Sequence, residues 1–237
     1  MTLRVIAIDG PAASGKSSTG ALVAARLGWA HLDSGALYRA VTLAVLDTVQ
    51  NRDTLDTRAV TPQRILAAAE SLPVRLVLVG DEFRPEIAGV DVADAIRSER
   101  VTRQVSAVAA IPQVRTWANA QQRQVVDAVE VGGGRGVVVD GRDIGTVVFP
   151  DAPLKIYLVA TPEERARRRL TQRGETLDEE AVRRESAALA ARDGADSTRP
   201  VAPLKPAADA VLLDSTALTL EAQVVRVVEL ARRVFPG

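Results

Sequence analysis

The sequence contains no cysteine among its 237 residues. This absence excludes a disulfide framework and thiol chemistry, and it fits a reducing compartment. A surplus of positive charge is also missing, since 30 lysines and arginines balance 30 aspartates and glutamates. We therefore expect no binding to nucleic acid or to an anionic membrane through a general electrostatic field.

Long apolar runs are absent as well, and none approaches the length of a membrane span. The first residues lead directly into a strand pattern, so we expect neither a signal peptide nor an anchor. Hydrophobic residues make up 47% and charged residues 25%, as in ordinary globular proteins. These features predict a cytoplasmic enzyme built on one globular domain. We expect this enzyme to be a monomer.

Short apolar runs alternate with helical patterns along the chain. A helix is predicted over 16–27, Thr161-Pro162-Glu163-Glu164 and Thr176-Leu177-Asp178-Glu179 both resemble helix starts, and 218–234 has apolar residues at helical spacing. The alternation indicates a doubly wound α/β fold. The runs that suit strands buried on both faces of a parallel sheet are 3–9, 136–140, 154–159 and 210–213.

One region departs from this rhythm. Residues 73–80 alternate around Arg75 and run into a segment that contains Asp81, Pro85 and Gly89. Alternation followed by turn residues is typical of antiparallel strands. We therefore expect an inserted subdomain over about 73–108.

A phosphate-binding loop stands between the first strand and the first helix, as Gly10-Pro11-Ala12-Ala13-Ser14-Gly15-Lys16-Ser17. The glycines let the backbone curl so that successive N–H groups point at phosphate oxygens, and Lys16 reaches the β- and γ-phosphates. The hydroxyl of Ser17 can bind Mg²⁺, which makes it the one predicted metal ligand. The predicted ATP-binding residues are Gly10, Pro11, Ala12, Ala13, Ser14, Gly15, Lys16, Ser17 and Ser18.

The loop alone does not identify the acceptor, because switch GTPases, mechanical ATPases and small-molecule kinases all carry it. An Asn-Lys-x-Asp guanine reader is missing, and Gly141-Arg142-Asp143 after the Walker-B-like strand 137–140 is unusual for a motor. Both observations favour a kinase. A regulatory nucleotide switch stays open as an alternative.

Three further motifs resemble those of the bacterial cytidylate kinases: Asp33-Ser34-Gly35-Ala36-Leu37-Tyr38-Arg39, Asp140 to Pro153, and Arg199-Pro200-Val201-Ala202-Pro203-Leu204. With the loop they span almost the entire chain. The resemblance implies transfer of the γ-phosphoryl group of ATP to CMP or dCMP. It also implies a P-loop nucleoside-monophosphate-kinase fold with a central parallel five-stranded sheet flanked by helices. The core would be 1–33, 112–160 and 206–237, the monophosphate-binding region about 34–111, and a helical lid about 161–205.

The guanidinium of arginine can donate two parallel hydrogen bonds to a phosphate, and a carboxylate can accept from the exocyclic amine of cytosine. The resemblance implies that Arg39, Arg115 and Arg142 clamp the acceptor phosphate. It further implies that Asp143, Ser106 and Arg199 read the base with Ser34 nearby, and that Arg192 and Asp196 reach the ribose and phosphates. The catalytic residues would be Lys16, Arg142 and Arg192. Without the motifs, these arginines would be surface or ion-paired residues, Ser106 a helix-surface serine and Asp196 a cap.

The predicted lid is rich in arginine, with Arg165, Arg167, Arg168, Arg169 and Arg173 in one helix. One or two of these should stabilise the transferring charge, although a solvated face with ion pairs would also explain them. Gly194 and Ala195 stand where family members usually carry charged residues. His31, the one histidine, is given a structural role. A broader UMP/CMP kinase or a small-metabolite kinase stays open, but Asp143 and the insert speak against it.

Overall fold

The computed structural model describes residues 4–48, 61–133 and 135–236. The chain divides into two compact units. The first unit comprises Met1–His31 and Gly134–Gly237, and the second comprises Leu32–Gly133. Among the described residues, no helix combines the length and apolar character that crossing a membrane requires.

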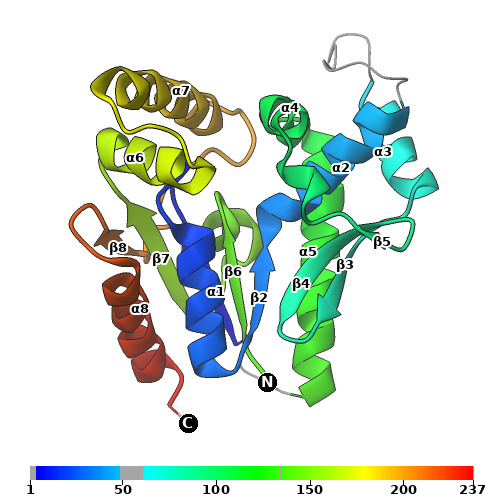
Figure 1. Ribbon diagram of the computed structural model, residues 1–237. Coiled ribbons are helices and arrows are strands. Elements are labelled where there is room, and N and C mark those ends of the chain that lie inside the picture. Colours follow the sequence, from blue (N-terminus) through cyan, green and yellow to red (C-terminus); the bar gives the residue numbers. More distant parts are fainter. Residues whose placement is uncertain (1–3, 49–60, 134, 237) are drawn as a thin grey trace. The chain divides into compact units, whose positions relative to one another are not determined.

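The first unit alternates strands and helices along most of its length (Figure 1). A short π-helical turn, η2, follows strand β6. The elements of this unit are β1 (Val5–Asp9), α1 (Lys16–Leu27), β2 (Ala30–Asp33, which continues into the second unit), β6 (Val137–Gly141), η2 (Ile144–Val148), β7 (Leu154–Val159), α6 (Pro162–Arg173), α7 (Glu179–Ser197), β8 (Val211–Asp214) and α8 (Leu220–Val234).

Strand β1 lies at the centre of the parallel strands, between β6 and β7. All its residues are buried, which explains why the strand reads as an uninterrupted apolar run until Asp9. The strand order is β2, β6, β1, β7, β8, and the Ala30 N–H donates to the Gly136 carbonyl at 3.0 Å. This arrangement confirms the predicted α/β fold with a central, mostly parallel sheet flanked by helices.

Helices α1 and α8 lie side by side and pack on these strands (Figure 1). Apolar residues of β1 and β7 form one buried cluster with Val224 and Val227 of α8. The run 210–213 was predicted to be a strand, which β8 confirms, but the prediction that this strand is buried on both faces was wrong. Strand β8 is bonded to β7, and Leu212 is 66% exposed because β8 ends the strand order.

The two helix-start signals have different outcomes. Thr161 caps α6 as predicted, since its side chain accepts from the Glu164 N–H and Pro162 takes the first helical position. The second signal predicts a cap at Thr176, but Asp178 is the cap and accepts from the Ala181 N–H at 2.7 Å. The carboxylate stands directly before the helix and reaches an unpaired backbone donor.

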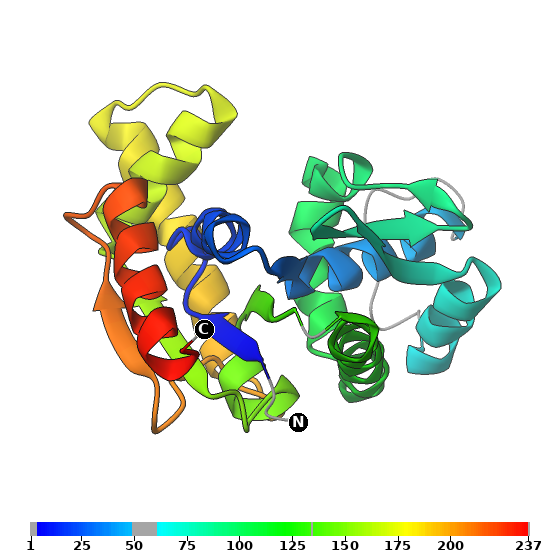
Figure 2. The same ribbon diagram turned by 90° about the horizontal axis from the view of Figure 1, so that it is seen from below.

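The second unit combines an antiparallel hairpin with helices. Strands β3 and β4 pair antiparallel, which confirms the antiparallel strands predicted in the insert. Helix α2 packs against this hairpin (Figure 2). Leu76 and Phe83 of the hairpin are buried. The elements are α2 (Ser34–Thr48), α3 (Pro62–Ser71), β3 (Val74–Val79), β4 (Glu82–Ile87), β5 (Val90–Asp91), the 3₁₀ turn η1 (Ala95–Arg97), α4 (Glu99–Ala109) and α5 (Pro112–Gly133).

Candidate active site

The loop between β1 and α1 has a backbone that few residues other than glycine can adopt. Gly10 has a φ of 149°, and a Cβ there would lie 2.1 Å from the Leu158 carbonyl oxygen. Gly15 has a φ of 96°. Ala13 takes a left-handed φ of 58°, which is uncommon for alanine. The strand, the tight curl and the helix therefore form the phosphate-binding geometry that the motif predicts.

Lys16 is buried at the start of α1, with 5% of its surface exposed. Its Nζ donates to the Pro11 carbonyl at 2.6 Å and to the Ser14 hydroxyl at 3.3 Å. Burial, and next the positive charge of Arg142, lower the pKa of Lys16 well below its ordinary value. The negative charge of a bound phosphate would favour the charged ammonium and so oppose both effects. The position of Lys16 therefore suits phosphate binding.

Ser17, Asp140 and His31 form a chain of hydrogen bonds beside the loop. The Ser17 hydroxyl donates to Asp140 Oδ2 at 2.6 Å, and His31 Nε2 lies 2.8 Å from Asp140 Oδ1. Burial opposes ionisation of Asp140, but the hydrogen bonds to His31 and Ser17 hold its pKa below the ordinary value. His31 is itself buried. The sequence named Asp140 only as the end of a Walker-B-like strand.

The donor set near Ser17 fits a hard cation such as Mg²⁺. It offers one hydroxyl and one carboxylate, and Mg²⁺ is usually held by one or two such groups together with substrate phosphates. No cluster of three or more His, Cys, Asp or Glu side chains suited to a metal occurs in the part of the chain that the structure describes. A metal held partly by the nucleotide therefore matches this site better than one held by protein alone.

Asp9 is a buried carboxylate that the sequence reading missed. It ends β1, and its two oxygens accept from the backbone N–H groups of Ile144 (2.8 Å) and Gly145 (2.7 Å). Burial raises the pKa of Asp9 to about 6 even though these two bonds lower it. A carboxylate at the end of an apolar strand, directly before the loop glycine, is the signal that could have found it. Asp9 fixes the backbone that follows Arg142 and Asp143.

A charged cluster lies where β6 and α7 end, in the first unit. Arg142 Nε donates to Asp196 Oδ2 at 3.2 Å, and Arg199 NH1 lies 3.7 Å from Asp196 Oδ1. Arg199 also donates to the backbone carbonyls of Asp196 and Ala202. Asp196 and Arg199 are both buried. The structure thus brings together three of the residues predicted to bind the acceptor.

Two other predicted acceptor residues, Asp143 and Arg192, also belong to the first unit. Asp143 is buried and close enough to Asp9 for its charge to contribute to the raised pKa of Asp9. Arg192 is half-buried on α7.

The remaining four predicted acceptor residues lie in the second unit. Arg39 donates to the Ile96 carbonyl (3.1 Å) and the Thr102 hydroxyl (3.0 Å). Arg115 is 3% exposed, its guanidinium stands 5.4 Å from the centre of the Tyr38 ring, and it donates to the Ala109 carbonyl. The other two are Ser34, buried at the start of α2, and Ser106, half-buried on α4.

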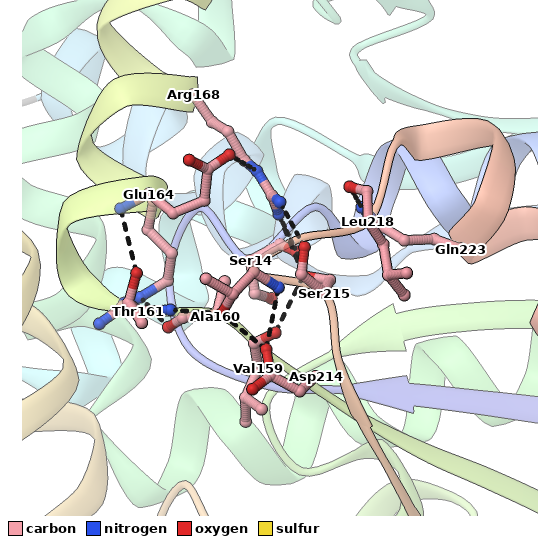
Figure 3. Close-up of polar contacts among 12 residues, drawn as sticks. Ser14, Val159, Ala160, Thr161, Glu164, Arg168, Asp214, Ser215, Leu218 and Gln223 are labelled. Carbon is pink, nitrogen blue, oxygen red and sulfur yellow. Dashed lines mark hydrogen bonds and ion pairs between the residues drawn. The ribbon is translucent and has the colours of Figure 1, made fainter.

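A pocket of about 420 Å³ adjoins the phosphate loop in the first unit. Loop residues, α6 arginines and apolar residues near the start of α8, among them Leu218, line it. Arg168 is one of the lining arginines. It pairs with Glu164 at 2.8 Å and donates to the Ser215 carbonyl at 2.6 Å (Figure 3). No sequence pattern points to Ser215, because this contact forms only where the end of β8 meets α6 at the loop.

A strand, a glycine-rich curl with a buried lysine, a helix and a parallel sheet define the class of P-loop nucleotide-binding proteins. The model of the family described as "Cytidylate kinase" matches residues 6–233. The chain is 44% identical to the cytidylate kinase of Pseudomonas aeruginosa over 236 residues, 97% of this chain and 95% of that protein. It is 43% identical to that of Pseudomonas fluorescens, covering 98% and 97% of the two chains. The chain belongs to the cytidylate kinase family, and the resemblance of its motifs is confirmed.

Among solved structures, the crystal structure of TT1252 from Thermus thermophilus is 18% identical and has a TM-score of 0.47, with both chains covered completely. A similarity at this level adds nothing to the assignment.

Proposed function

We propose that this chain transfers the γ-phosphoryl group of ATP to CMP or dCMP and releases ADP and CDP or dCDP. Its membership of the cytidylate kinase family carries this conclusion, and it makes the chain a nucleotide-binding kinase. The buried loop lysine and the Ser17–Asp140 hydrogen bond support it.

The residues 10–18 are assigned to ATP. The backbone N–H groups of the loop would hold the phosphates, and Lys16 would turn its ammonium from the Pro11 carbonyl toward them. The pocket beside the loop offers apolar surface at Leu218 and Leu220 and the guanidinium of Arg169, so we assign the ATP base to it. Ser17 and Asp140 would hold Mg²⁺ with the nucleotide. When bound, the metal neutralises charge on the β- and γ-phosphates.

The acceptor residues stay as the motifs assign them. Arg39, Arg115 and Arg142 hold the phosphate of CMP, and Asp143, Ser106, Arg199 and Ser34 select cytosine. Arg192 and Asp196 reach the ribose and phosphates. The pairing of Asp196 with Arg142 and Arg199 supports a preformed part of this site, because the carboxylate orients both arginines before substrate arrives.

Phosphoryl transfer depends on position and charge more than on covalent chemistry. The phosphate of CMP is already an oxyanion, so the reaction needs no general base. Lys16, Arg142 and Arg192 are the catalytic residues in this proposal, since they place positive charge on the transferring group. We also propose a cytoplasmic monomer without nucleic-acid or membrane partners. Its working parts are a core (1–33, 112–160, 206–237), a monophosphate-binding region (34–111) and a lid (161–205).

A coupled assay with ATP, Mg²⁺ and each nucleoside monophosphate tests the proposal. We expect turnover with CMP and dCMP far above that with UMP or AMP. Equal turnover of UMP would contradict the cytosine-reading residues. ATP hydrolysis that no added monophosphate accelerates would instead indicate a regulatory switch.

A further inference from the structure

Helices α6 and α7 both bind the backbone of one phosphate-loop residue, Ala12. The Ala12 N–H donates to Asp193 Oδ1 of α7 at 2.8 Å, and Arg165 NH1 of α6 donates to the Ala12 carbonyl at 3.0 Å. Arg165 and Asp193 also form an ion pair with each other. Both polar groups of the Ala12 backbone are therefore held by one pair of opposite charges, in which Arg165 is buried and Asp193 is half-buried.

Apolar contacts reinforce this attachment. Ala12 is 1% exposed, and its methyl group belongs to a cluster with Leu170 of α6 and Val182 and Leu189 of α7. Ala13 packs against the same cluster. Figure 1 shows α6 and α7 side by side next to the loop that precedes α1.

The contact with Arg165 sets the direction of a peptide group in the loop. The Ala12 carbonyl and the Ala13 N–H belong to one planar trans peptide, so they point in opposite directions. Holding the carbonyl at Arg165 turns the Ala13 N–H away from that arginine. Ala13 has a left-handed φ of 58°, a conformation that persists where the surroundings enforce it.

The buried position of Arg165 separates it from the other arginines of α6. Only 7% of its side chain is exposed, and it donates to the carbonyls of Ala160 and Ala12 as well as to Asp193. These bonds direct its guanidinium at protein acceptors. Arg165 therefore acts on ATP through the loop and not as a phosphate ligand.

We propose that Asp193 and Arg165 are positioning residues that hold the Ala12–Ala13 peptide in the conformation that binds ATP. Through this pair, the arrangement of α6 and α7 controls the affinity of the phosphate loop. The inference rests on the proposed function only in that residues 10–18 bind ATP.

Calorimetric titration with ADP and steady-state kinetics of Asp193→Ala test this role. We expect ADP affinity to fall and the KM for ATP to rise about tenfold, while the KM for CMP changes less than about threefold. Asp193→Asn keeps the shape and one acceptor, so it should lose less, and it serves as the test if Asp193→Ala does not fold. Ser186→Ala is the matched control, because it removes a hydrogen bond between the same helices, from the Ser186 hydroxyl of α7 to the Pro162 carbonyl of α6, without a contact to the loop or to the pocket beside it.

The variant Ala13→Gly tests whether Asp193 acts by positioning the loop or only by helping the two helices to pack. Glycine adopts a left-handed φ readily, so adding Ala13→Gly to Asp193→Ala should restore part of the ADP affinity. Failure of this rescue, unchanged ADP affinity in Asp193→Ala, or an equal loss of ADP affinity in Ser186→Ala would overturn the inference. CMP phosphorylation by the wild-type chain tests the proposed function separately, because ADP binding needs no acceptor.

Discussion

The phosphate loop and the Arg142–Asp196–Arg199 cluster, both proposed here to bind anions, are built in two different ways in one unit of the protein. The loop uses backbone N–H groups within a few consecutive residues, and glycine conformations determine its shape. The cluster uses side chains that are distant in sequence, since Arg142 and Asp196 are 54 residues apart. The function of a backbone site should be sensitive to added side-chain atoms that clash with the loop. The function of a side-chain site should be sensitive to loss of an ion-pair partner.

The largest effect should follow from a methyl group in the loop. Gly10→Ala places a Cβ 2.1 Å from the Leu158 carbonyl oxygen at a φ of 149°, so the loop or β7 must shift. We expect a loss of about 4 kcal/mol in unfolding free energy and more than about 100-fold in kcat/KM.

Gly28→Ala is the control for this experiment, measured by urea unfolding and the coupled assay. Gly28 also has a left-handed φ, 65°, but a Cβ there would meet nothing within 4 Å. Gly28→Ala should lower the unfolding free energy by only about 1 to 2 kcal/mol and keep its activity. Equal losses in both variants would show that φ alone, and not steric fit, shapes the loop.

A second prediction concerns Asp9, which stands between the two regions. Its pKa, raised by burial to about 6, means that the folded chain binds a proton more tightly than the unfolded chain. The resulting stability is present below about pH 4 and is lost as the pH rises through 6. Between these values, the wild-type chain should lose about 3 kcal/mol relative to Asp9→Asn.

Urea unfolding of both chains at several pH values between 4 and 7 measures this difference. Parallel curves over that range would contradict a buried, weakly acidic Asp9.

The charged cluster should respond to loss of its carboxylate. Asp196→Ala leaves Arg142 and Arg199 without their shared acceptor, so the KM for CMP should rise roughly thirtyfold. ADP affinity should stay within about threefold, because the loop does not contain these residues. Asp196→Asn retains a hydrogen-bond acceptor, so its KM for CMP should lie between that of the wild type and that of Asp196→Ala. A matching loss of ADP affinity would show that the cluster and the loop are one site.

The same contrast explains what the sequence predicted well. Strand β1, the loop and α1 follow from consecutive residues, and the helix predicted over 16–27 is α1. The run 154–159 matches β7 for the same reason. These elements depend on local patterns that any reader of the sequence can see.

Features that depend on distant partners were harder to predict. The apolar pattern of β8 does not reveal that the strand ends the strand order, so Leu212 was expected to be buried. Asp9, Arg165 and Asp193 are ordinary charged residues in sequence, and only the fold brings them to the loop. The motif-based acceptor residues lie in both units, and their roles stay predictions until substrate is bound.

The smallest of these effects should come from a change at Ser17. Ser17 refines the comparison of backbone and side-chain sites, because here, as at Lys16, the loop relies on a side chain. Its hydroxyl donates to Asp140 and is our proposed Mg²⁺ ligand. Ser17→Ala should lower kcat about tenfold and raise the Mg²⁺ concentration needed for half-maximal rate. Ser17→Thr keeps the hydroxyl and should stay within about threefold of the wild type. If Ser17→Ala retained full activity at low Mg²⁺, the loop would act through its backbone and Lys16 alone, and Asp140 would have to hold the metal without Ser17.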